Sequence, residues 1–220
     1  MKSLTHLPMA ALAVLTVAGC SSAAGSGAET TPEPAGENAE FEALYRARQD
    51  SAMRLYTDAD VRFMTGMIGH HGQALVMSAL APKNDAGPSI DILTSRIINA
   101  QKDEIAVMQQ WLRDRGQTVP EIQIDGITMM VHGPEYAMHM PGMLTEQQLQ
   151  ELEVARGSEF DKLFLTYMIQ HHQGAVTMVH ELFETDGAGI DEVVFKVASD
   201  IQADQTTEIA RMELMLEDMN

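Results

Sequence analysis

The stretch that decides the fold runs from Asp60 to Met77 and reads DVRFMTGMIGHHGQALVM. A second stretch, from Asp161 to Met178, reads DKLFLTYMIQHHQGAVTM. Asp, Phe, Thr, Met, Ile, both His, Ala and the last Met coincide at a constant offset of 101 residues. A further match joins QKDEIAVM at 101–108 with QTTEIARM at 205–212. The spacing is too long for a solenoid repeat, so it indicates a duplicated helical hairpin.

Signals at the ends of these segments predict the helix boundaries. Ser/Thr-x-x-Asp capping boxes begin the two copies at Thr57–Asp60 and Ser158–Asp161. Pro82 and the turn residues 84–88 end the first helix, and 186–189 end its counterpart. The other helices are expected from about Ser89 to Arg115, from about Ile190 to Met219, from about Glu40 to Leu55, and from Thr145 onward.

Two such hairpins predict an all-α fold, a ferritin-like four-helix bundle. The helical domain is expected to span 40–220, with repeats at about 57–115 and 158–219 joined by a connector at 116–144. No strand is predicted at any point.

The repeated histidines and methionines are expected to share one helix face. Each helical residue advances by about 100°, which puts His70 and His71 on the same side as Met67 and Met77, with the small Ala74 between them. The same spacing gives the twin face His171, His172, Met168 and Met178. The second helices offer Gln101, Glu104 and Met108, and Gln205, Glu208 and Met212, in one stripe each.

Two interpretations of these faces stay open. Buried imidazoles need partners, so a hydrogen-bonded polar core with Met as filler would explain them. An adjacent His pair, duplicated and flanked by thioethers, favours metal binding instead. Asp60 and Asp161 are interpreted as caps, because they lie about 15 Å along the axis from the His pairs. His180 falls off the inward face and is expected at the surface.

The connector carries a second concentration of soft ligands. Its Pro and Gly residues break regular structure, so a helix core does not explain the run. Thioether with imidazole selects Cu(I) over Zn, Mg or Ca, and the alternative is a loop that lays Met side chains over the bundle. The candidate ligands here are Met129, Met130, His132, Met138, His139, Met140 and Met143.

The first 39 residues predict export and attachment. Lys2 precedes a short apolar run at 7–18, and small residues lead up to Cys20, as in a bacterial lipobox. We expect residues 1–19 to be a lipoprotein signal peptide and Cys20 to carry the lipid; the alternative is an ordinary cleavage site beside a chance Cys. Residues 20–39, rich in Ser, Ala, Gly and Glu, predict a flexible linker.

Composition removes several function classes. The net charge of −18 over 220 residues argues against nucleic acid and anionic membrane surfaces as partners. A single Cys excludes a disulfide framework and a Cys-rich zinc module. His-Glu-x-x-His, Gly-x-Ser-x-Gly and phosphate-cradling motifs are missing from the sequence, as is the carboxylate set of a di-iron bundle.

The phrases MIGHH (67–71), MIQHHQGA (168–175), MPGMLT (140–145), FDKLFL (160–165) and the Gln-x-x-Glu-Ile-x-x-Met pair resemble the bacterial family called domain of unknown function 305. The resemblance covers about residues 57–219. It implies a ferritin-like bundle, and copper binding through His and Met, because some exported members are linked to copper resistance. It implies the two His–Met faces and the connector as sites. Gly72-Gln73 and Gln173-Gly174 replace acidic residues that some members carry there.

The sequence therefore predicts a lipid-anchored extracytoplasmic protein that binds copper, buffering or passing on Cu(I), without catalysis. Glu104, Glu208, Gln101 and Gln205 would orient the imidazoles from behind. Another transition metal is the alternative ion, and membrane contact is expected only through Cys20. The alternative functions are a ferritin-like metal-dependent oxidoreductase and a structural or interaction module built on a His-based polar core.

Overall fold

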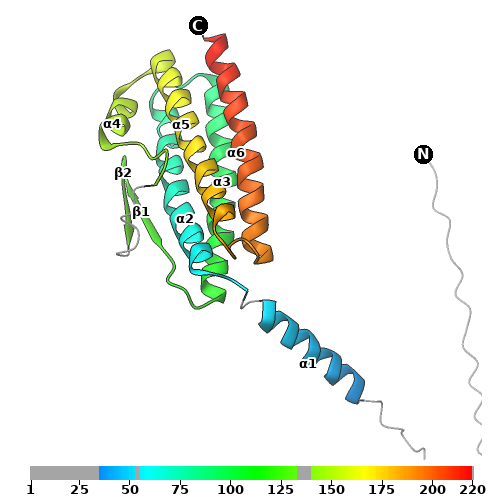
Figure 1. Cartoon of the computed structure of the whole chain (residues 1–220). Coiled ribbons are helices and arrows are strands. Elements are labelled where there is room, and N and C mark those ends of the chain that lie inside the picture. The colour runs from blue at the N-terminus through cyan, green and yellow to red at the C-terminus, as the bar shows by residue number, and fades with distance from the viewer. Residues whose placement is uncertain (1–34, 53–54, 133–139, 220) are drawn as a thin grey trace, which may run out of the picture. The chain divides into compact units, whose positions relative to one another are not determined.

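The computed structural model describes residues 35–52, 55–132 and 140–219. Four long helices form the bundle in Figure 1, which confirms the predicted all-α, four-helix architecture. The bundle helices are α2 (Asp58–Ser78), α3 (Pro88–Asp114), α5 (Gly157–Glu184) and α6 (Glu192–Asp218). The remaining elements are α1 (Ala35–Ala52), a 3-10 turn (Ala81–Lys83), β1 (Glu121–Asp125), β2 (Thr128–His132) and α4 (Glu146–Val154).

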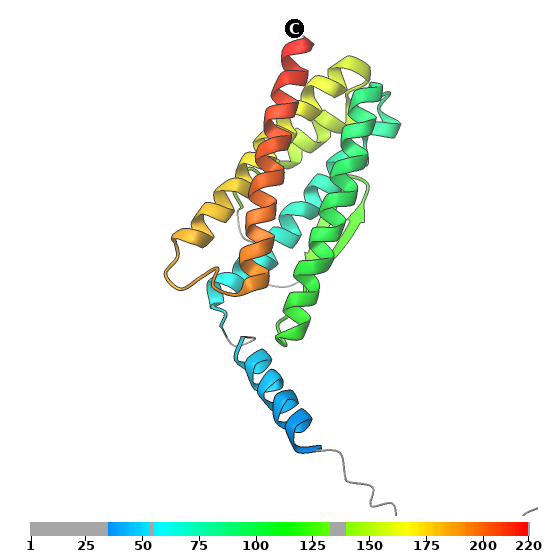
Figure 2. The ribbon, with the colours of Figure 1, turned by 90° about the vertical axis from the view of Figure 1, so that its right-hand side faces the viewer.

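The duplication appears as two antiparallel helical hairpins. Helix α2 packs along α3, and α5 packs along α6. Figure 2 shows α3 and α6 on one side of the bundle with α2 and α5 behind them. The hairpins meet mainly through α2 and α5, whereas α3 and α6 touch far less. Helices α2 and α5 therefore form the centre of the molecule.

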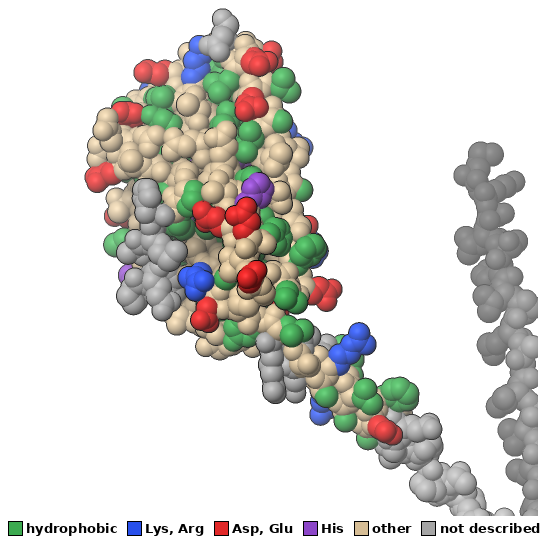
Figure 3. Space-filling view, viewed as in Figure 1, with side chains coloured by type: hydrophobic (Ala, Val, Ile, Leu, Met, Phe, Trp, Pro, Cys, Tyr) green, Lys and Arg blue, Asp and Glu red, His purple; other side chains and the backbone are tan. Residues whose placement is uncertain are grey.

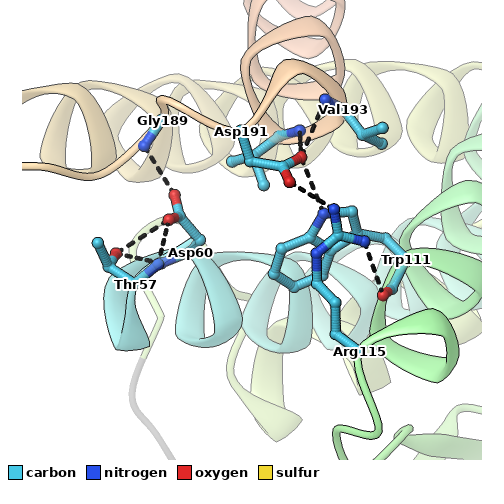
Figure 4. A network of polar contacts seen from close by, with 8 residues as sticks. Thr57, Asp60, Trp111, Arg115, Gly189, Asp191 and Val193 are labelled. Atoms are coloured by element: carbon cyan, nitrogen blue, oxygen red, sulfur yellow. Dashed lines mark hydrogen bonds and ion pairs between the residues drawn. The ribbon is translucent and has the colours of Figure 1, made fainter. Parts of the chain in front are cut away.

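Two aspartates tie each hairpin to the turn of the other. Asp60, at the start of α2, accepts a hydrogen bond of 2.7 Å from the Gly189 backbone N–H (Figure 4). Asp161, near the start of α5, accepts one of 3.1 Å from the Gly87 backbone N–H. Because α2 and α5 run antiparallel, the start of each helix lies beside the turn that ends the other one. The carboxylates therefore fix how the hairpins dock.

The capping prediction is confirmed at α2 and wrong at α5. Thr57 and Asp60 form the reciprocal capping box. Helix α5 begins instead at Gly157, and its N-cap residue Arg156 makes no side-chain cap bond. Asp161 is bonded to Gly87 of the other hairpin, so its carboxylate is not available to cap its own helix.

A second polar network closes the end of the bundle shown in Figure 4. Asp191 caps α6 through the backbone N–H groups of Val193 and Val194, and it also accepts from the Trp111 indole at 3.0 Å. Arg115 completes the network with an ion pair to Asp191 and lies over the Trp111 ring, 4.3 Å from its centre. The network joins α3 to the turn before α6.

The absence of strands is a wrong prediction. Residues 121–132 form an antiparallel hairpin in which Glu121 pairs with His132 and Asp125 with Thr128. The physical reason is a two-residue turn at Gly126 and Ile127, with Gly126 at φ +59°. Glycine as the first of two loop residues between β-forming segments is a hairpin signal, so the sequence did carry it.

The connector packs on a stripe of glycines in α2. A Cβ at Gly72 would lie 2.7 Å from the Met129 sulfur, and one at Gly69 would lie 3.5 Å from Met140 Cε. Gly66, one turn earlier, faces the Met140 sulfur. In α5, a Cβ at Gly174 would lie 2.0 Å from the Pro141 carbonyl oxygen. These missing side chains let the connector approach both central helices closely.

Helix α4 covers the corresponding part of the second copy. Thr145 and Gln148 form the capping box at its start, as the sequence predicts. Leu149 and Leu152 of α4 are buried in the core. The amide of Asn84 holds the end of α4 by donating to the carbonyls of Leu152 and Ala155.

Helix α1 covers 35–52, whereas the sequence predicts a helix over 40–55. Among the described residues, no helix has the length and apolar character needed to cross a membrane. The signal peptide, most of the linker and Cys20 lie outside the described residues, as do Met138 and His139 of the connector.

Gly174→Ala is expected to destabilise the domain by about 1–3 kcal/mol, the usual range for overpacking, because the new methyl group meets backbone that cannot rotate away. Urea unfolding followed by Trp111 fluorescence measures the change. Gly66→Ala is the matched control, since its Cβ meets only side-chain atoms at 3.4 Å or more. It should be neutral or stabilising by up to about 1 kcal/mol. Equal destabilisation by both substitutions would contradict the close approach of Pro141.

Candidate metal centre

Four histidines lie together in the middle of the bundle. His70 and His71 come from α2, His171 and His172 come from α5, and all four are completely buried. The rings of His70 and His171 face each other across the contact between the hairpins, with centroids 3.9 Å apart. Within each pair the rings are 6.4 Å and 6.2 Å apart. The duplication therefore brings the two predicted His pairs into one cluster.

Each imidazole uses its Nε2 atom to contact an oxygen of another segment. His70 Nε2 lies 3.0 Å from the Pro141 carbonyl oxygen, and His171 Nε2 lies 3.0 Å from the His70 carbonyl oxygen. His71 Nε2 contacts Glu104 at 2.8 Å, and His172 Nε2 contacts Glu208 at 2.7 Å. Glu104 and Glu208 thus contact His71 and His172, and their role behind a metal-bound ring stays a prediction.

The Nδ1 atoms are the unusual part of the cluster. None of the four has a hydrogen-bond partner among the residues that the structure describes, and all are buried. A carbonyl or ionised carboxylate oxygen only accepts, so the hydrogen of each neutral ring lies on Nε2. In each ring that is neutral, Nδ1 therefore keeps a free lone pair. Unpaired buried acceptors are costly, and four in one place call for a common explanation.

Burial keeps most of these rings neutral. It lowers the pKa of His70 to about 3, with help from electrostatic repulsion between the two neighbouring rings and against the hydrogen bond to Pro141. Burial also holds the pKa of His171 well below its usual 6.5, and the other three histidines lower it further. The pKa of His172 is lowered by burial, although Glu208 opposes the shift. Neutral imidazole is the form that binds metal.

Buried thioethers flank the cluster on both sides. The apolar core consists of two groups of side chains, and each holds methionines from both hairpins. The repeat relates the two sets, Met67, Met108 and Met178 in one group and Met168, Met212 and Met77 in the other. The predicted ligand set lacks Met108 and Met212. Their position one turn after Glu104 and Glu208 in the repeated motif is the signal that finds them.

Gln101 and Gln205 are also buried, one turn from the glutamates. Neither Gln101 amide atom nor the Gln205 amide oxygen has a hydrogen-bond partner within the described part of the chain. Polar side chains with unused donors and acceptors therefore extend the cluster along α3 and α6. No contact joins either glutamine to a histidine in the described structure, so an orienting role for them stays a prediction.

The predicted connector ligands do not form one group. Met130 and His132 are exposed on β2, with Met130 exposed by 49%. Alternate strand positions point to opposite faces, so Met129 is directed inward onto Gly72. Met140 is buried and Met143 is half-buried against the core. The connector therefore lays some Met side chains over the bundle, which is the alternative that the sequence left open.

The donor atoms of the centre are soft. In the described ranges, no three His, Cys, Asp or Glu side chains are grouped so that they could hold a metal ion by themselves. The acidic residues lie mostly outside, and Figure 3 shows Asp and Glu side chains scattered over one face of the bundle. His180 is exposed, as predicted. A centre of imidazole nitrogens flanked by thioethers suits a soft ion better than Mg²⁺ or Ca²⁺.

Comparison with known proteins identifies relatives of this architecture. The family model described as "Domain of unknown function (DUF305)" matches residues 60–216. A predicted secreted DUF305 protein from Streptomyces coelicolor is 25% identical, with a TM-score of 0.60 over 73% of this chain and 93% of its own. A DUF305 fragment from Deinococcus radiodurans is 29% identical, with a TM-score of 0.61 over 74% and 98%. No curated protein matches the chain.

The protein CopM is a third structural relative. Its Cu(I)-bound form is 27% identical to this chain, with a TM-score of 0.54 over 72% of this chain and 96% of its own. CopM has also been solved with Cu(II) and with silver. Metal binding therefore occurs among proteins of this fold.

Acidification is expected to destabilise the metal-free domain. The unfolded chain takes up protons near the ordinary His pKa of 6.5, whereas folded His70 does so only near 3. The stabilisation is complete above pH 6.5 and is lost as the pH falls toward 3, by up to about 1.4 kcal/mol per pH unit for each such histidine. Urea unfolding between pH 7.5 and pH 4.5 measures the slope.

The variant His70→Gln/His171→Gln should show a shallower loss of stability with acid than the wild type. His180→Gln, which changes an exposed histidine, should keep the wild-type slope. Identical slopes for all three proteins would mean that the buried rings are protonated as easily as exposed ones.

Proposed function

The chain belongs to the DUF305 family, and from this membership and its buried His–Met cluster we propose that it binds copper, as Cu(I), outside the cytoplasm. Binding rather than catalysis is the proposed role. The protein would buffer the ion or pass it to another carrier. The family has no defined function in its own description, so the chemistry of the centre carries the proposal.

The single observation behind the proposal is that four buried Nδ1 atoms lie in one cluster without a hydrogen-bond partner among the described residues. Each Nδ1 belongs to a ring whose Nε2 atom is already bonded to an oxygen of another segment. This bond fixes the orientation of the ring and therefore of its Nδ1 atom. His70, His71, His171 and His172 are the candidate nitrogen donors; since no three of them are grouped to hold an ion by themselves, thioether sulfur would have to complete the coordination. Met67 and Met168, buried three residues before each pair, would supply thioether sulfur. Such a set favours Cu(I).

The relatives support copper as the ion. CopM binds Cu(I), Cu(II) and silver, and silver(I) is chemically close to Cu(I). Among the described residues, no three His, Cys, Asp or Glu side chains are grouped as a metal site, so the roughly four carboxylates of a bridged redox centre are not gathered there. This supports a carrier over the oxidoreductase that the sequence left as an alternative.

The proposed location is the outer face of the cytoplasmic membrane or the cell envelope. The lipobox-like residues before Cys20 support lipid attachment there, and the Streptomyces coelicolor relative is described as secreted by prediction. Cu(I) handling outside the cytoplasm would suit a tethered domain, because the linker lets it reach partners near the membrane.

Competitive titration tests the function. The purified domain is added to a coloured Cu(I)–chelator complex, and the loss of colour reports transfer of the ion. We expect tight uptake by the wild type, and strong weakening in His70→Gln/His171→Gln because two ligand nitrogens are lost. His180→Gln should bind as the wild type does. A wild-type domain that leaves all the Cu(I) on the chelator at micromolar concentrations is incompatible with the proposal.

Glu104→Gln/Glu208→Gln tests the carboxylates behind the histidines. The amide oxygen still accepts from Nε2–H, but the negative charge that makes the ring a better ligand is gone. We expect Cu(I) affinity to fall by about 10–100-fold, as for other residues that orient metal-bound histidine. Glu151→Gln is the control, because Glu151 bonds to Tyr167 on the surface. Unchanged affinity in the double variant would show that the carboxylates serve the fold alone.

A further inference from the structure

A pocket of about 230 Å³ opens beside the candidate metal centre. It lies between the first turns of α2, the last turns of α5 and the connector. Arg62 and Glu181 carry opposite charges at its edge, so it has little net charge. The residues that matter here are Ala59, Arg62, Met140, Pro141, Met178 and Glu181.

The pocket shares a wall with the histidine cluster. Pro141 lines it, and the carbonyl oxygen of Pro141 is the acceptor for His70 Nε2, 3.0 Å away. His70 is completely buried. Pro141 therefore lies both in the wall of the pocket and against His70 of the cluster.

Two thioethers meet at this place. A Cβ on Gly66 would lie 3.4 Å from Met178 Cε and 3.7 Å from the Met140 sulfur, so both side chains reach the same turn of α2. Both line the pocket, and both are 9% exposed, whereas Met67, Met77 and Met168 are fully buried. Met140 and Met178 are thus the methionines at the boundary between solvent and the centre.

The duplication shows what a closed version of this opening looks like. At the repeat offset, Phe160 and Leu163 stand where Ala59 and Arg62 line the pocket, and Met77 stands where Met178 does. Helix α4 packs over that region, and Phe160 and Met77 are fully buried there. The two copies are therefore equivalent at the histidines but not at their outer ends: α4 covers one end, and the described residues leave a pocket at the other.

We propose that the open pocket is the port through which a soft monovalent cation enters and leaves the centre. Met140 and Met178 bind the ion first through their sulfurs, and His70 lies next on the inward path. The inference rests on the proposed function. It adds a route and a transient two-thioether site to it.

A second hollow offers the competing route. It measures about 510 Å³ and lies between α3 and α6, where it reaches Glu104 behind His71. Its charged lining is mainly acidic, with Asp103, Asp200 and Asp204. Carboxylates attract hard cations and have no special preference for Cu(I), and this hollow is lined by no thioether among the described residues. Its chemistry fits the ion less well than the Met140–Met178 pair does.

The same substitution in each hollow separates the routes. Ala59→Phe places in the port the residue that its sealed counterpart carries, and Ala100→Phe fills the groove between α3 and α6. Stopped-flow mixing with the coloured Cu(I)–chelator complex gives the rate of uptake, and the endpoint gives the amount bound. We expect Ala59→Phe to load more slowly by about tenfold or more, with the wild-type endpoint, and Ala100→Phe to load at the wild-type rate.

Met140→Leu/Met178→Leu removes the two sulfurs while keeping the side chains apolar and of similar size. It should also load at least about tenfold more slowly, since capture by sulfur is lost. Circular dichroism checks that each variant keeps its helices. If Ala59→Phe unfolds, the loading rate of the conservative Leu variant tests the port.

The outcomes are distinct. Wild-type rates in both port variants, or slow loading in Ala100→Phe alone, would overturn the port. A wild-type protein that takes up no Cu(I) would instead overturn the proposed function, and the port with it.

Discussion

Four contacts between elements at the centre of this bundle each include one imidazole Nε2 atom. His71 joins α2 to Glu104 of α3, and His172 joins α5 to Glu208 of α6. His171 joins α5 to the backbone of α2 at His70, and His70 joins α2 to the connector at Pro141. Buried neutral imidazoles are tolerated only when their donors are satisfied, so these bonds restrict how the helices can slide. The same bonds occupy Nε2 and leave Nδ1 without a partner among the described residues, so fold and candidate chemistry depend on the same four rings.

Much of this arrangement follows from the sequence, because it depends on local signals and on the repeat. The 101-residue offset predicts two hairpins, and helical periodicity predicts that His70, His71 and their twins share a face. The contacts that could not be predicted are those between distant segments. The bond from His70 to Pro141 depends on how the connector crosses α2, and the bond from Asp161 to Gly87 depends on how the hairpins dock. The β-hairpin is different, because it depends on a local turn signal at Gly126 that can be recognised in the sequence.

The two copies have kept their inner residues and changed their outer ones. Identical His, Ala and Met positions lie on α2 and α5, the two central helices. Away from it, the first copy is covered by the β-hairpin and connector, and the second by α4. The repeated residues at the centre are therefore covered differently on their two sides, and one side is better protected from solvent than the other. The duplication thus supplies the ligands, and the later divergence decides how they are reached.

The glycine stripe of α2 also sets an order of assembly. Gly66, Gly69 and Gly72 together weaken the intrinsic helix by roughly 3 kcal/mol relative to alanine. Helix α5 has one interior glycine, Gly174, so it depends less on its surroundings to become helical. We therefore expect the second hairpin to be the template on which the first one folds. The two duplicated hairpins, similar in the folded protein, would then have unequal roles in its folding. The first hairpin would form later and would close around the histidines.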